Sequence, residues 1–472
     1  MIVASRREDG MAQLNSKERK EKSVSTIRIS TALSIILIVL LAPFRGSAQE
    51  IRSPLPSLRE QDAIQQEWLK LRLERVLPPL MREHKVQMWI VPMREYNEDP
   101  VFSSLVSATT FSARRRTIYV FYDRGEQKGV ERLALGGSSQ GGLYSAYRDT
   151  TLKNAELIGD AQWRLLSKIV AERNPRTISV NISRVHAFSD GLSAGEWEQL
   201  KKALGPRYLR KVVRADRLPL DYIATRLPEM LPVYKEMMKT VHAIIEQAFS
   251  NSVIVPGKTT TQDVVWWMRQ KIQELGLTTW FQTSVDIQRR GVDLSSKPDP
   301  VIERGDVLHC DFGITGMRLN TDTQHMAYVL KEGETDVPSG IQSTLSVSNK
   351  LQDIVVNTIE LGLTGNQVLS RSLAEMKKAG IDGSVYSHPV GEHGHGAGTL
   401  IGLWDRQMGV PDRGDVPFIP NTWYSIELRA GSKVAEWDNQ IVRSAQEEDV
   451  VIDSQGSVKW ILSRQTKFHI IR

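Results

Sequence analysis

The pattern of hydrophobic and polar residues predicts alternating helices and strands from residue 50 to about residue 220. Residues 60–84 place apolar side chains at helical spacing. We expect the Pro78–Pro79 pair to interrupt this helix, because proline lacks the backbone N–H that continues a helix. Runs rich in β-branched and aromatic residues are typical of strands. Three such runs follow, at residues 86–93, 117–123 and 177–183. This part of the chain is therefore expected to form an α/β domain.

The pattern changes near residue 225, where longer amphipathic segments replace the short alternating ones. Residues 227–249 and 260–276 are expected to form helices, and Thr260 or Thr261 is a natural N-cap for the second of them. Strand-like runs and glycine-rich turns then continue to the C-terminus. The change predicts two domains, residues 49–224 and residues 225–472.

Residues 1–48 are expected to be a secretory signal peptide. Basic residues at positions 17–28 precede a largely apolar stretch, Ala32–Pro43, and Gly46 and Ala48 stand at positions −3 and −1 of an expected cleavage site. The apolar stretch would span about 18 Å as a helix, which is short for a bilayer. The prediction is therefore export to the periplasm or beyond, with an uncleaved N-terminal anchor as the alternative.

Composition and charge narrow the possible partners. The hydrophobic share of 40% and the charged share of 25% over 472 residues are ordinary for a globular protein of two domains. The first 48 residues carry eight Lys/Arg against four Asp/Glu, so they supply +4 of the net charge of +6 and leave only about +2. We therefore expect no nucleic-acid partner, and no stable membrane partner once the signal peptide is removed. The single cysteine, Cys310, excludes an internal disulfide, and strand alternation is expected to bury it on the face opposite Asp311.

Residues 307–330 predict a β-hairpin that carries two aspartates. Its strands are joined through Gly313 and Gly316, and Asp311 and Asp322 lie eleven residues apart. A turn centred near Gly316–Met317 would place both carboxylates on one face, opposite or nearly opposite each other. Two carboxylates about 5 Å apart repel each other, and a divalent cation is the usual way to neutralise them. The alternative is a pair of solvated aspartates beside a turn.

The glycine-rich stretch 387–402 concentrates three of the nine histidines of the chain, which are His388, His393 and His395. Neutral imidazole is a common nitrogen ligand of divalent transition metals. The stretch therefore predicts a metal-binding loop, with a loop of ordinary hydrogen-bonded histidines as the alternative.

Two later strand-like runs contain candidate acidic ligands. Glu427 lies among apolar residues in the run 421–431, and Glu447 and Glu448 precede the apolar end of the run 442–453. A buried glutamate costs several kcal/mol unless it is paired or bound to a metal. A solvated turn is the alternative for Glu447 and Glu448.

In chain order, these residues resemble the metal ligands of the methionine aminopeptidase, prolidase and aminopeptidase P family. The shared features are the order Asp, Asp, His, Glu, Glu, the eleven-residue aspartate spacing, a Gly-His-Gly-x-Gly loop and an acidic pair before a late apolar strand. The resemblance covers roughly residues 225–465 and is closest in layout to the Xaa-Pro aminopeptidases. It implies an α+β protein in which a smaller α/β, creatinase-like domain precedes a pita-bread (creatinase/aminopeptidase) domain.

The resemblance implies a dinuclear metal site. Its implied ligands are Asp311, Asp322, His395, Glu427 and Glu447. His395 is preferred because it lies in the Gly-His-Gly-x-Gly loop, with His393 and His388 as alternatives, and Glu447 is preferred to Glu448. Manganese is the expected metal, with cobalt, zinc or iron as alternatives.

The family also implies roles for these residues. Asp322 and Glu447 would bridge the two ions, and a water held between them would be the nucleophile. Glu427 would transfer the proton, and His388 or His393 would stabilise the oxyanion.

The implied substrate is a peptide with a free N-terminus, of Xaa-Pro type, cleaved after its first residue by a protein that often forms homo-oligomers. The chain departs from the family at four places. Gly402 replaces a substrate-handling histidine, and Gln324–His325 replaces a Thr-Arg pair. No histidine lies some seventeen residues before Asp311, and Leu428 replaces the proline that usually follows the first glutamate. These changes leave the metal ligands in place and put the substrate preference in doubt. The alternatives to a metal-dependent aminopeptidase are a non-catalytic binding protein on the same fold and a metal-free, creatinase-like C–N hydrolase.

Overall fold

The computed structural model describes residues 50–148 and 160–472, which lie in one compact unit. The expected signal peptide, residues 1–48, is outside the described residues. Within the described ranges, no helix is both long enough and apolar enough to cross a membrane.

A six-stranded mixed sheet forms the centre of the first domain, with the strand order β4-β3-β2-β1-β5-β6. Its strands are β1 Met88–Arg94, β2 Arg116–Asp123, β3 Val130–Leu135, β4 Ser145–Tyr147, β5 Ile178–Val180 and β6 Val212–Arg214. The central strand β1 is antiparallel to β2 and parallel to β5. The three strands predicted from the sequence are thus confirmed as β1, β2 and β5.

Helices accompany this sheet. They are α1 Leu58–Leu71, α2 Leu77–Glu83, α3 Phe102–Leu105, α5 Ala161–Arg173, α6 Ala194–Leu209, α7 Leu218–Ala224 and the short 3-10 turn η2 Ala187–Ser189. The expected interruption at Pro78–Pro79 was wrong. A π-helical turn, η1 Arg72–Val76, joins α1 to α2, and both prolines lie in the first turn of α2. The first turn of a helix has unpaired N–H groups in any case, so prolines are tolerated there.

A nine-stranded sheet forms the centre of the second domain, in the order β12-β14-β15-β11-β8-β7. Three further strands join this path, β13 on β14, β16 on β15 and β17 on β11. The strands are β7 Ser284–Gln288, β8 Val307–Phe312, β11 Thr323–Val329, β12 Asp382–Val385, β13 His388–Pro389, β14 Thr422–Val434, β15 Gln440–Ile452, β16 Val458–Trp460 and β17 His469–Ile471. A separate two-stranded ribbon consists of β9 Thr315–Gly316 and β10 Leu319–Asn320.

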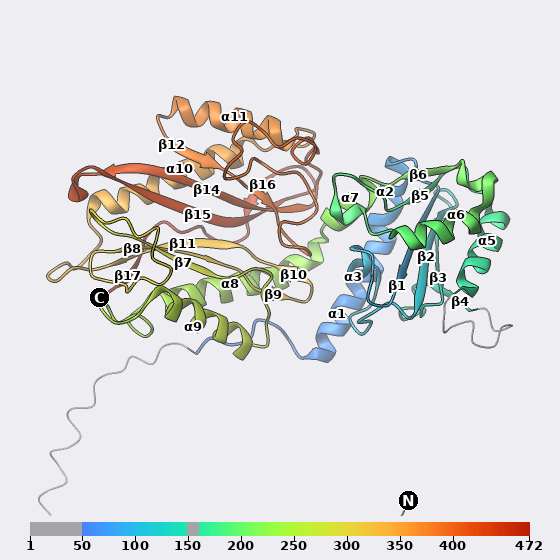
Figure 1. The fold of residues 1–472 in the computed structure, drawn as a ribbon, viewed down its shortest axis with the longest axis horizontal. Coiled ribbons are helices and arrows are strands. Elements are labelled where there is room, and N and C mark those ends of the chain that lie inside the picture. The colour runs from blue at the N-terminus through green and yellow to red at the C-terminus, as the bar shows by residue number, and fades with distance from the viewer. Residues whose placement is uncertain (1–49, 149–159) are drawn as a thin grey trace, which may run out of the picture. The chain divides into compact units, whose positions relative to one another are not determined.

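Two helix pairs pack on this sheet, α8 and α9 on the strands β7 and β8, and α10 and α11 on the strands β12 and β14. In Figure 1 the strands lie between the two pairs. The helices are η3 Pro228–Met230, α8 Leu231–Ala248, α9 Thr261–Glu274, α10 Ser339–Thr358, α11 Gly365–Lys378 and η4 Ala435–Trp437. The two helices predicted from the sequence are confirmed as α8 and α9. Thr260 is the N-cap of α9, and its hydroxyl accepts a hydrogen bond from the Asp263 N–H at 3.2 Å.

Buried apolar residues fill the space between helices and sheet. Ile244 and Ile245 of α8 lie in one cluster with Cys310 and Phe312 of β8, whereas Leu351 of α10 belongs to a second cluster with residues of β14. The single cysteine is fully buried, as expected. The side chains that alternate with these apolar ones point away from the helices, and the candidate site is built from them.

Candidate metal centre

The two aspartates of the predicted hairpin share one face of the sheet. Asp311 on β8 pairs with Gln324 of β11, and Phe312 pairs with Thr323, so Asp322 is a diagonal neighbour of Asp311. Residues in this relation point to the same side of a hairpin. The sequence expectation of nearly opposite carboxylates on one face is therefore confirmed.

The hairpin turn lies at Met317–Arg318, one residue later than the sequence indicates. Gly316 pairs with Leu319 across it. Both turn residues have positive φ, 49° and 62°, as a two-residue turn between twisted antiparallel strands requires. Neither is a glycine, so the turn is strained and needs support from its surroundings.

Strands β14 and β15 bring the two glutamates to this face. Glu427 pairs directly with Glu447, and Glu447 also pairs with Gln324 of β11. Glu447 therefore lies between the aspartate hairpin and Glu427. Carboxylate oxygens of Asp311, Asp322 and Glu447 lie within 4.8 Å of one another. The structure thus brings all four predicted acidic ligands together.

His388 completes the group. It lies on β13, which pairs with β14 so that His388 faces Ser425. Its Nε2 atom is 3.0 Å from Glu447, 3.5 Å from Asp322 and 3.7 Å from Glu427. The imidazole is thus in contact with three carboxylates, and only 4% of its side chain is exposed.

Of the other two histidines of this loop, His395 lies beside this group and His393 lies outside it. The His395 ring stands perpendicular to the His388 ring, with the ring centroids 4.5 Å apart, and its nitrogen lies within 4.8 Å of ligand atoms of Asp322 and His388. The His393 ring instead contacts the carbonyl oxygen of Pro100 at 3.0 Å. Of the three candidates, His388 has the closest contacts with the carboxylates, His395 is beside it, and His393 is outside the group.

Burial and mutual repulsion raise the pKa values of the carboxyl groups. The pKa of Asp311 is raised to about 7, first by burial and then by the charge of Glu447. The same two causes raise the pKa values of Asp322 and Glu427 well above their usual range. Without a cation, these groups therefore retain protons that a free carboxyl group would lose.

The pKa values of His388 and His395 shift in opposite directions. Burial lowers the pKa of His388, but hydrogen bonds with Asp322 and Glu447 outweigh it and raise that pKa well above its usual value. The pKa of His395 is lowered to about 4, first because the surrounding protein partly desolvates the ring and then by the charge of His388, although part of the residue stays accessible to solvent. His395 is therefore a neutral imidazole near pH 7.

The group fits divalent metal ions. Within the described part of the chain, one oxygen each of Asp311 and Asp322 is buried without a hydrogen-bond partner. An unpaired buried carboxylate oxygen is costly, and a cation removes that cost. Asp311, Asp322 and Glu447 form one possible ligand group, and His388, Glu427 and Glu447 form another. A third group, Asp322, His388 and His395, includes the histidine preferred from the sequence.

Glu448, the alternative to Glu447, points away from this group. Its carboxylate contacts His325 at 2.7 Å and His242 at 3.1 Å. Successive strand residues face opposite sides, so only one glutamate of the pair can join the group.

Gln324 was not recognised from the sequence as part of the site. Its amide donates hydrogen bonds to Glu427 at 2.6 Å and to Glu447 at 2.8 Å, while its carbonyl oxygen contacts His309 Nε2 at 2.9 Å. It therefore fixes the orientation of two acidic groups. The only sequence signal was that Gln324 stands where the family has a threonine.

Asp449 is a second residue that sequence reasoning missed. It accepts a hydrogen bond from the Tyr234 hydroxyl at 2.7 Å and one from the Asp322 backbone N–H at 3.4 Å. Burial raises its pKa to about 8. Asp449 thus helps to hold the backbone of Asp322, and its place directly after an acidic pair was the only available hint.

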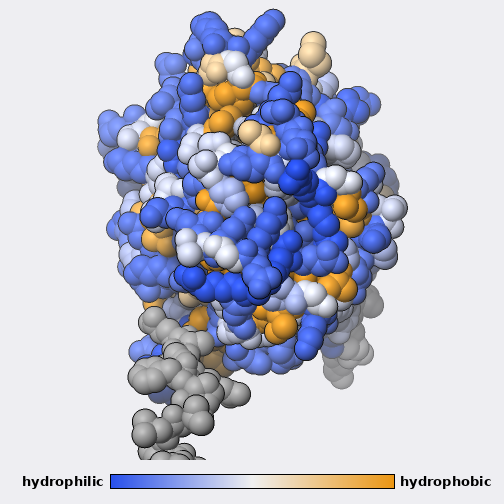
Figure 2. All heavy atoms as spheres, turned by 90° about the vertical axis from the view of Figure 1, so that its left-hand side faces the viewer, coloured by the Kyte–Doolittle hydropathy of each residue, from blue (hydrophilic) through white to orange (hydrophobic). Residues whose placement is uncertain are grey.

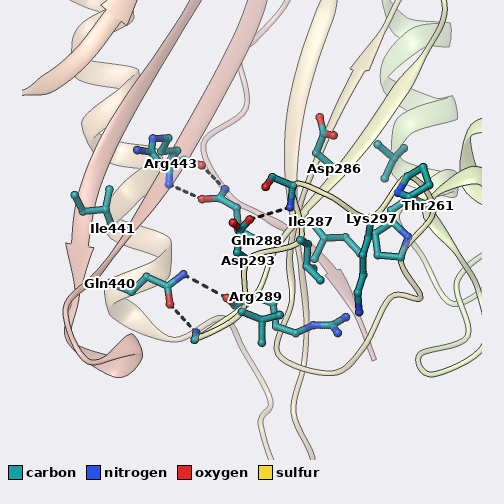
Figure 3. A pocket seen from close by; sticks show the side chains of 17 residues that line it. Thr261, Asp286, Ile287, Gln288, Arg289, Asp293, Lys297, Gln440, Ile441 and Arg443 are labelled. Carbon is teal, nitrogen blue, oxygen red and sulfur yellow. Dashed lines mark hydrogen bonds between the residues drawn. The ribbon is translucent and has the colours of Figure 1, made fainter.

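An open pocket of about 570 Å³ lies beside β7 and the start of β15. Figure 3 shows Gln288 of β7 bridging both backbone groups of Arg443, with hydrogen bonds of 2.8 and 2.7 Å. Asp286 on the pocket wall contacts His309 at 3.5 Å, and His309 contacts Gln324, so a chain of polar contacts links the pocket to the acidic group. The face of the molecule in Figure 2 is mainly hydrophilic, with hydrophobic residues in separate spots.

Residues of the first domain contact the histidine loop and the aspartate hairpin. The Ser103 hydroxyl donates a hydrogen bond to Glu392 at 2.7 Å, and Phe188 stacks on His393. The Arg318 guanidinium donates to the carbonyl oxygens of Ser103, Val106 and Ser107. These bonds support the strained turn of the hairpin.

Comparison with known families decides the assignment of this domain. Residues 236–453 match the model of metallopeptidase family M24. All four acidic residues and His388 lie inside the matched range. The M24 match confirms the resemblance inferred from the order of these residues. No curated protein sequence matches the chain.

Solved structures share the fold over most of the chain. The X-Pro aminopeptidase of Thermotoga maritima MSB8 superimposes with a TM-score of 0.57 at 16% identity, over 83% of this chain and 99% of that one. The Xaa-Pro dipeptidase of Bacillus anthracis gives 0.55 at 15% identity, over 86% and 99%. The N-terminal domain of the FACT complex subunit SPT16 from chickpea, Cicer arietinum, gives 0.54 at 10% identity, over 86% and 99%.

These likenesses establish the fold. The chain has the expected α+β architecture, an M24 pita-bread domain preceded by an N-terminal domain. The same fold occurs in structures named as peptidases and in one named as a subunit of a complex. Function therefore has to be argued from the site.

Proposed function

We propose that this protein is an aminopeptidase that uses two divalent metal ions to hydrolyse the N-terminal peptide bond of Xaa-Pro peptides. The observation that carries the proposal is the buried group of four carboxyl groups and one imidazole, in which two carboxylate oxygens lack a partner among the described residues. The M24 match and the fold shared with two Xaa-Pro peptidases support it.

Two sets of residues would hold the ions. Asp311, Asp322 and Glu447 would hold one, and His388, Glu427 and Glu447 the other, so Glu447 would contribute to both. Carboxylate and imidazole ligands suit manganese, which remains the expected metal. When bound, two such ions supply an activated water as nucleophile and polarise the scissile carbonyl group.

The proposed proton carrier is Glu427. A proton carrier must lie within reach of the reacting groups, and the Glu427 carboxylate lies 3.7 Å from His388 Nε2, in one possible ligand group with His388 and Glu447. The Gln324 amide holds Glu427 in place at 2.6 Å. Glu427 can therefore accept a proton during attack and return it to the leaving amine.

The geometry favours His388 over His395 as the imidazole ligand. The resemblance had implied different roles, with His395 as the ligand and His388 or His393 as the residue that stabilises the oxyanion. His388 is buried among three carboxylates, whereas His395 is exposed. Alanine variants test this assignment by metal content. We expect His388→Ala to lose bound metal and His395→Ala to keep it; the reverse result would restore His395 as the ligand.

His395 would then contact the substrate. The family has a substrate-handling histidine where this chain has Gly402. At that glycine φ is +79°, and a Cβ atom would collide with the carbonyl oxygen of Val385. No other residue type fits there, so the substrate contact has to come from elsewhere. His395 is exposed, neutral near pH 7 and adjacent to His388, so it can donate a hydrogen bond to a peptide carbonyl.

The deciding experiment measures metal content and peptide cleavage on protein produced without residues 1–48. We expect about two ions per chain, as a dinuclear site requires, and loss of both metal and activity in Asp322→Ala. His393→Ala is a matched control, because His393 lies in the same loop but contacts Pro100 instead of the acidic group. Ala-Pro-Ala and Ala-Ala-Ala are suitable first substrates, and preference for the former supports the Xaa-Pro assignment.

The other outcomes identify the alternatives. Two bound ions without cleavage of any peptide would indicate a binding protein, as the fold of a complex subunit illustrates. No bound metal after incubation with manganese or cobalt, together with hydrolysis of a small C–N substrate such as creatine, would indicate a metal-free hydrolase.

We also propose that the protein is exported and that residues 1–48 are removed. The support is the order of basic, apolar and small residues in this segment. N-terminal sequencing of the protein recovered from the periplasm or medium tests this, and an N-terminus at Gln49 is expected. Light scattering on the same material tests the expected homo-oligomer.

A further inference from the structure

A second cluster of ligand-type side chains lies away from the candidate metal centre. It combines His242 of α8, His325 of β11, Glu448 of β15 and His469 of β17. Each of these residues comes from a different element. The cluster is absent from the ligand set discussed above and has no role in the proposed peptidase reaction.

Strand alternation separates the two groups. Gln324 and Glu447 are paired across β11 and β15 and face the acidic group, and the next residues in each strand, His325 and Glu448, contact each other at 2.7 Å. His325 also pairs with Cys310, which is buried against α8. The second cluster therefore lies on the face of β11 that α8 covers.

Three ligand atoms converge in this cluster. The Nε2 atoms of His325 and His242 both approach the Glu448 carboxylate, at 2.7 and 3.1 Å. One ligand atom from each of the three residues lies within 4.8 Å of the other two. The ligands of a tetrahedral zinc ion are about 3.3 Å apart, given zinc–nitrogen distances of about 2.0–2.1 Å. The side chains are thus close to the spacing that such an ion requires.

A further histidine orients one of these ligands. The Nδ1 atom of His325 lies 3.1 Å from Nε2 of His469. If Nε2 of His325 binds a metal, its Nδ1–H must be the donor, and His469 Nε2 is then the acceptor. Metal-binding histidines usually donate their second N–H to such a partner, which fixes the ring.

Burial and charge also suit a cation. Only 3% of the Glu448 side chain and 5% of the His325 side chain are exposed, whereas 23% of the His242 side chain is exposed. Among the described residues, the ion pairs of Glu448 are with these two imidazoles. The buried Glu448 carboxylate is thus paired only with imidazoles, which carry no permanent positive charge. The partly exposed His242 gives an ion access from solvent.

We propose that His242, His325 and Glu448 bind one zinc-class divalent ion, separate from the two ions of the proposed peptidase site. Two imidazoles and one carboxylate form a known zinc ligand set, with a water in the fourth position. The ion would connect α8 to β11 and β15, while His469 attaches the C-terminal strand β17 through its contact with His325. The proposal does not depend on peptidase activity.

The test counts zinc in a protein whose acidic group is disabled. In the Asp322→Asn/Glu447→Gln double variant, every possible ligand group of the acidic site has lost at least one residue. Equilibrium dialysis of this variant against zinc chloride, followed by elemental analysis, is expected to give about one ion per chain. Adding His242→Asn should remove this ion, whereas adding His186→Asn should not. His186 is a matched control, because it is a partly buried histidine of the first domain that takes no part in either group.

A second variant separates a metal site from an ordinary hydrogen-bond network. Replacing His469 with asparagine should weaken zinc binding about 10–100-fold without abolishing it, as is typical for partners of metal ligands. Cobalt absorption in the visible range gives an independent signal of imidazole coordination. If the double variant fails to fold, the same count is made in the parent chain, where His242→Asn should lower zinc by one ion. Zinc content that is unchanged by His242→Asn, or no zinc bound by a folded double variant, would overturn the proposal.

Discussion

Replacing Asp322 with asparagine should stabilise the metal-free protein and destabilise the metal-loaded one. Asparagine has the same shape as aspartate but no charge. The Asp322 side chain is 4% exposed, and one of its oxygens has no hydrogen-bond partner within the described residues. The substitution therefore removes the charge that Asp322 would gain on losing its proton, and it leaves the packing nearly unchanged.

The magnitude follows from the spacing of the carboxylates. Oxygen atoms of Asp311, Asp322 and Glu447 lie within 4.8 Å of one another. Two full charges 4.8 Å apart repel by about 3.5 kcal/mol at an effective dielectric constant of 20. Protonation and the nearby His388 relieve part of this repulsion. We therefore expect the free energy of unfolding of metal-free Asp322→Asn to rise by about 1–3 kcal/mol at pH 8.

Bound metal reverses the sign of the effect that Asp322→Asn has on the free energy of unfolding. Each ion present at 100 times its dissociation constant stabilises the parent by about 2.7 kcal/mol, and a variant that has lost a ligand gains little of this. The assay is urea unfolding of both proteins, with a chelator and with manganese. Asp221→Asn is a control, because Asp221 is buried and paired with Arg217 and His84, so its loss should destabilise the protein in both conditions. A metal-free Asp322→Asn that is less stable than the parent would refute the argument from repulsion, and equal stabilisation of both proteins by manganese would refute Asp322 as a ligand.

Three other predictions follow from the same geometry. The pKa of Asp311 is raised from its ordinary value of 3.8 to about 7 in the folded protein, so the folded state holds this proton more tightly than the unfolded state does. The metal-free protein should therefore lose stability as the pH rises from about 4 to about 7, and a melting temperature that rises over this range would contradict the prediction. Replacing Gln324 with methionine should weaken manganese binding about 10–100-fold, because the hydrogen bonds that orient Glu427 and Glu447 are lost. Isothermal titration calorimetry measures this change in affinity directly. Burial raises the pKa of the Cys310 thiol, so Ellman's reagent should label this thiol only after denaturant unfolds the domain. Rapid labelling of the native protein would instead show that the cysteine is accessible.

Much of this fold could be predicted because its signals are local. The apolar spacing of residues 227–249 and 260–276 identifies α8 and α9, and Thr260 marks the start of the second. The eleven-residue spacing of Asp311 and Asp322 fixes their common face through the geometry of one hairpin. In each case a single segment of chain determines the result.

The parts that could not be predicted depend on pairing between distant segments. Three histidines share one loop, and His388 lies among the carboxylates only because β13 pairs with β14. Gln324 joins the group because β11 meets β15 at Glu447, and Asp449 joins it through Tyr234 of α8. No local pattern encodes these contacts. The proline pair was misjudged for a different reason, since a π-helical turn is rarely visible in a sequence.

The pairing of β11 with β15 also explains how one short stretch can contribute to two separate groups. Glu447 faces the acidic group and Glu448 faces the histidine cluster, although they are adjacent in the chain. A shift of this pairing by one residue would exchange the two glutamates and place each beside the wrong partners. The register is fixed on both sides, by the Gln324–Glu447 contact on one face and by the His325–Glu448 contact on the other. Glu447→Gln should therefore affect manganese binding and peptide cleavage. Glu448→Gln should instead affect zinc binding in the double variant. Equal effects of both changes on both metals would show that the two groups are not independent.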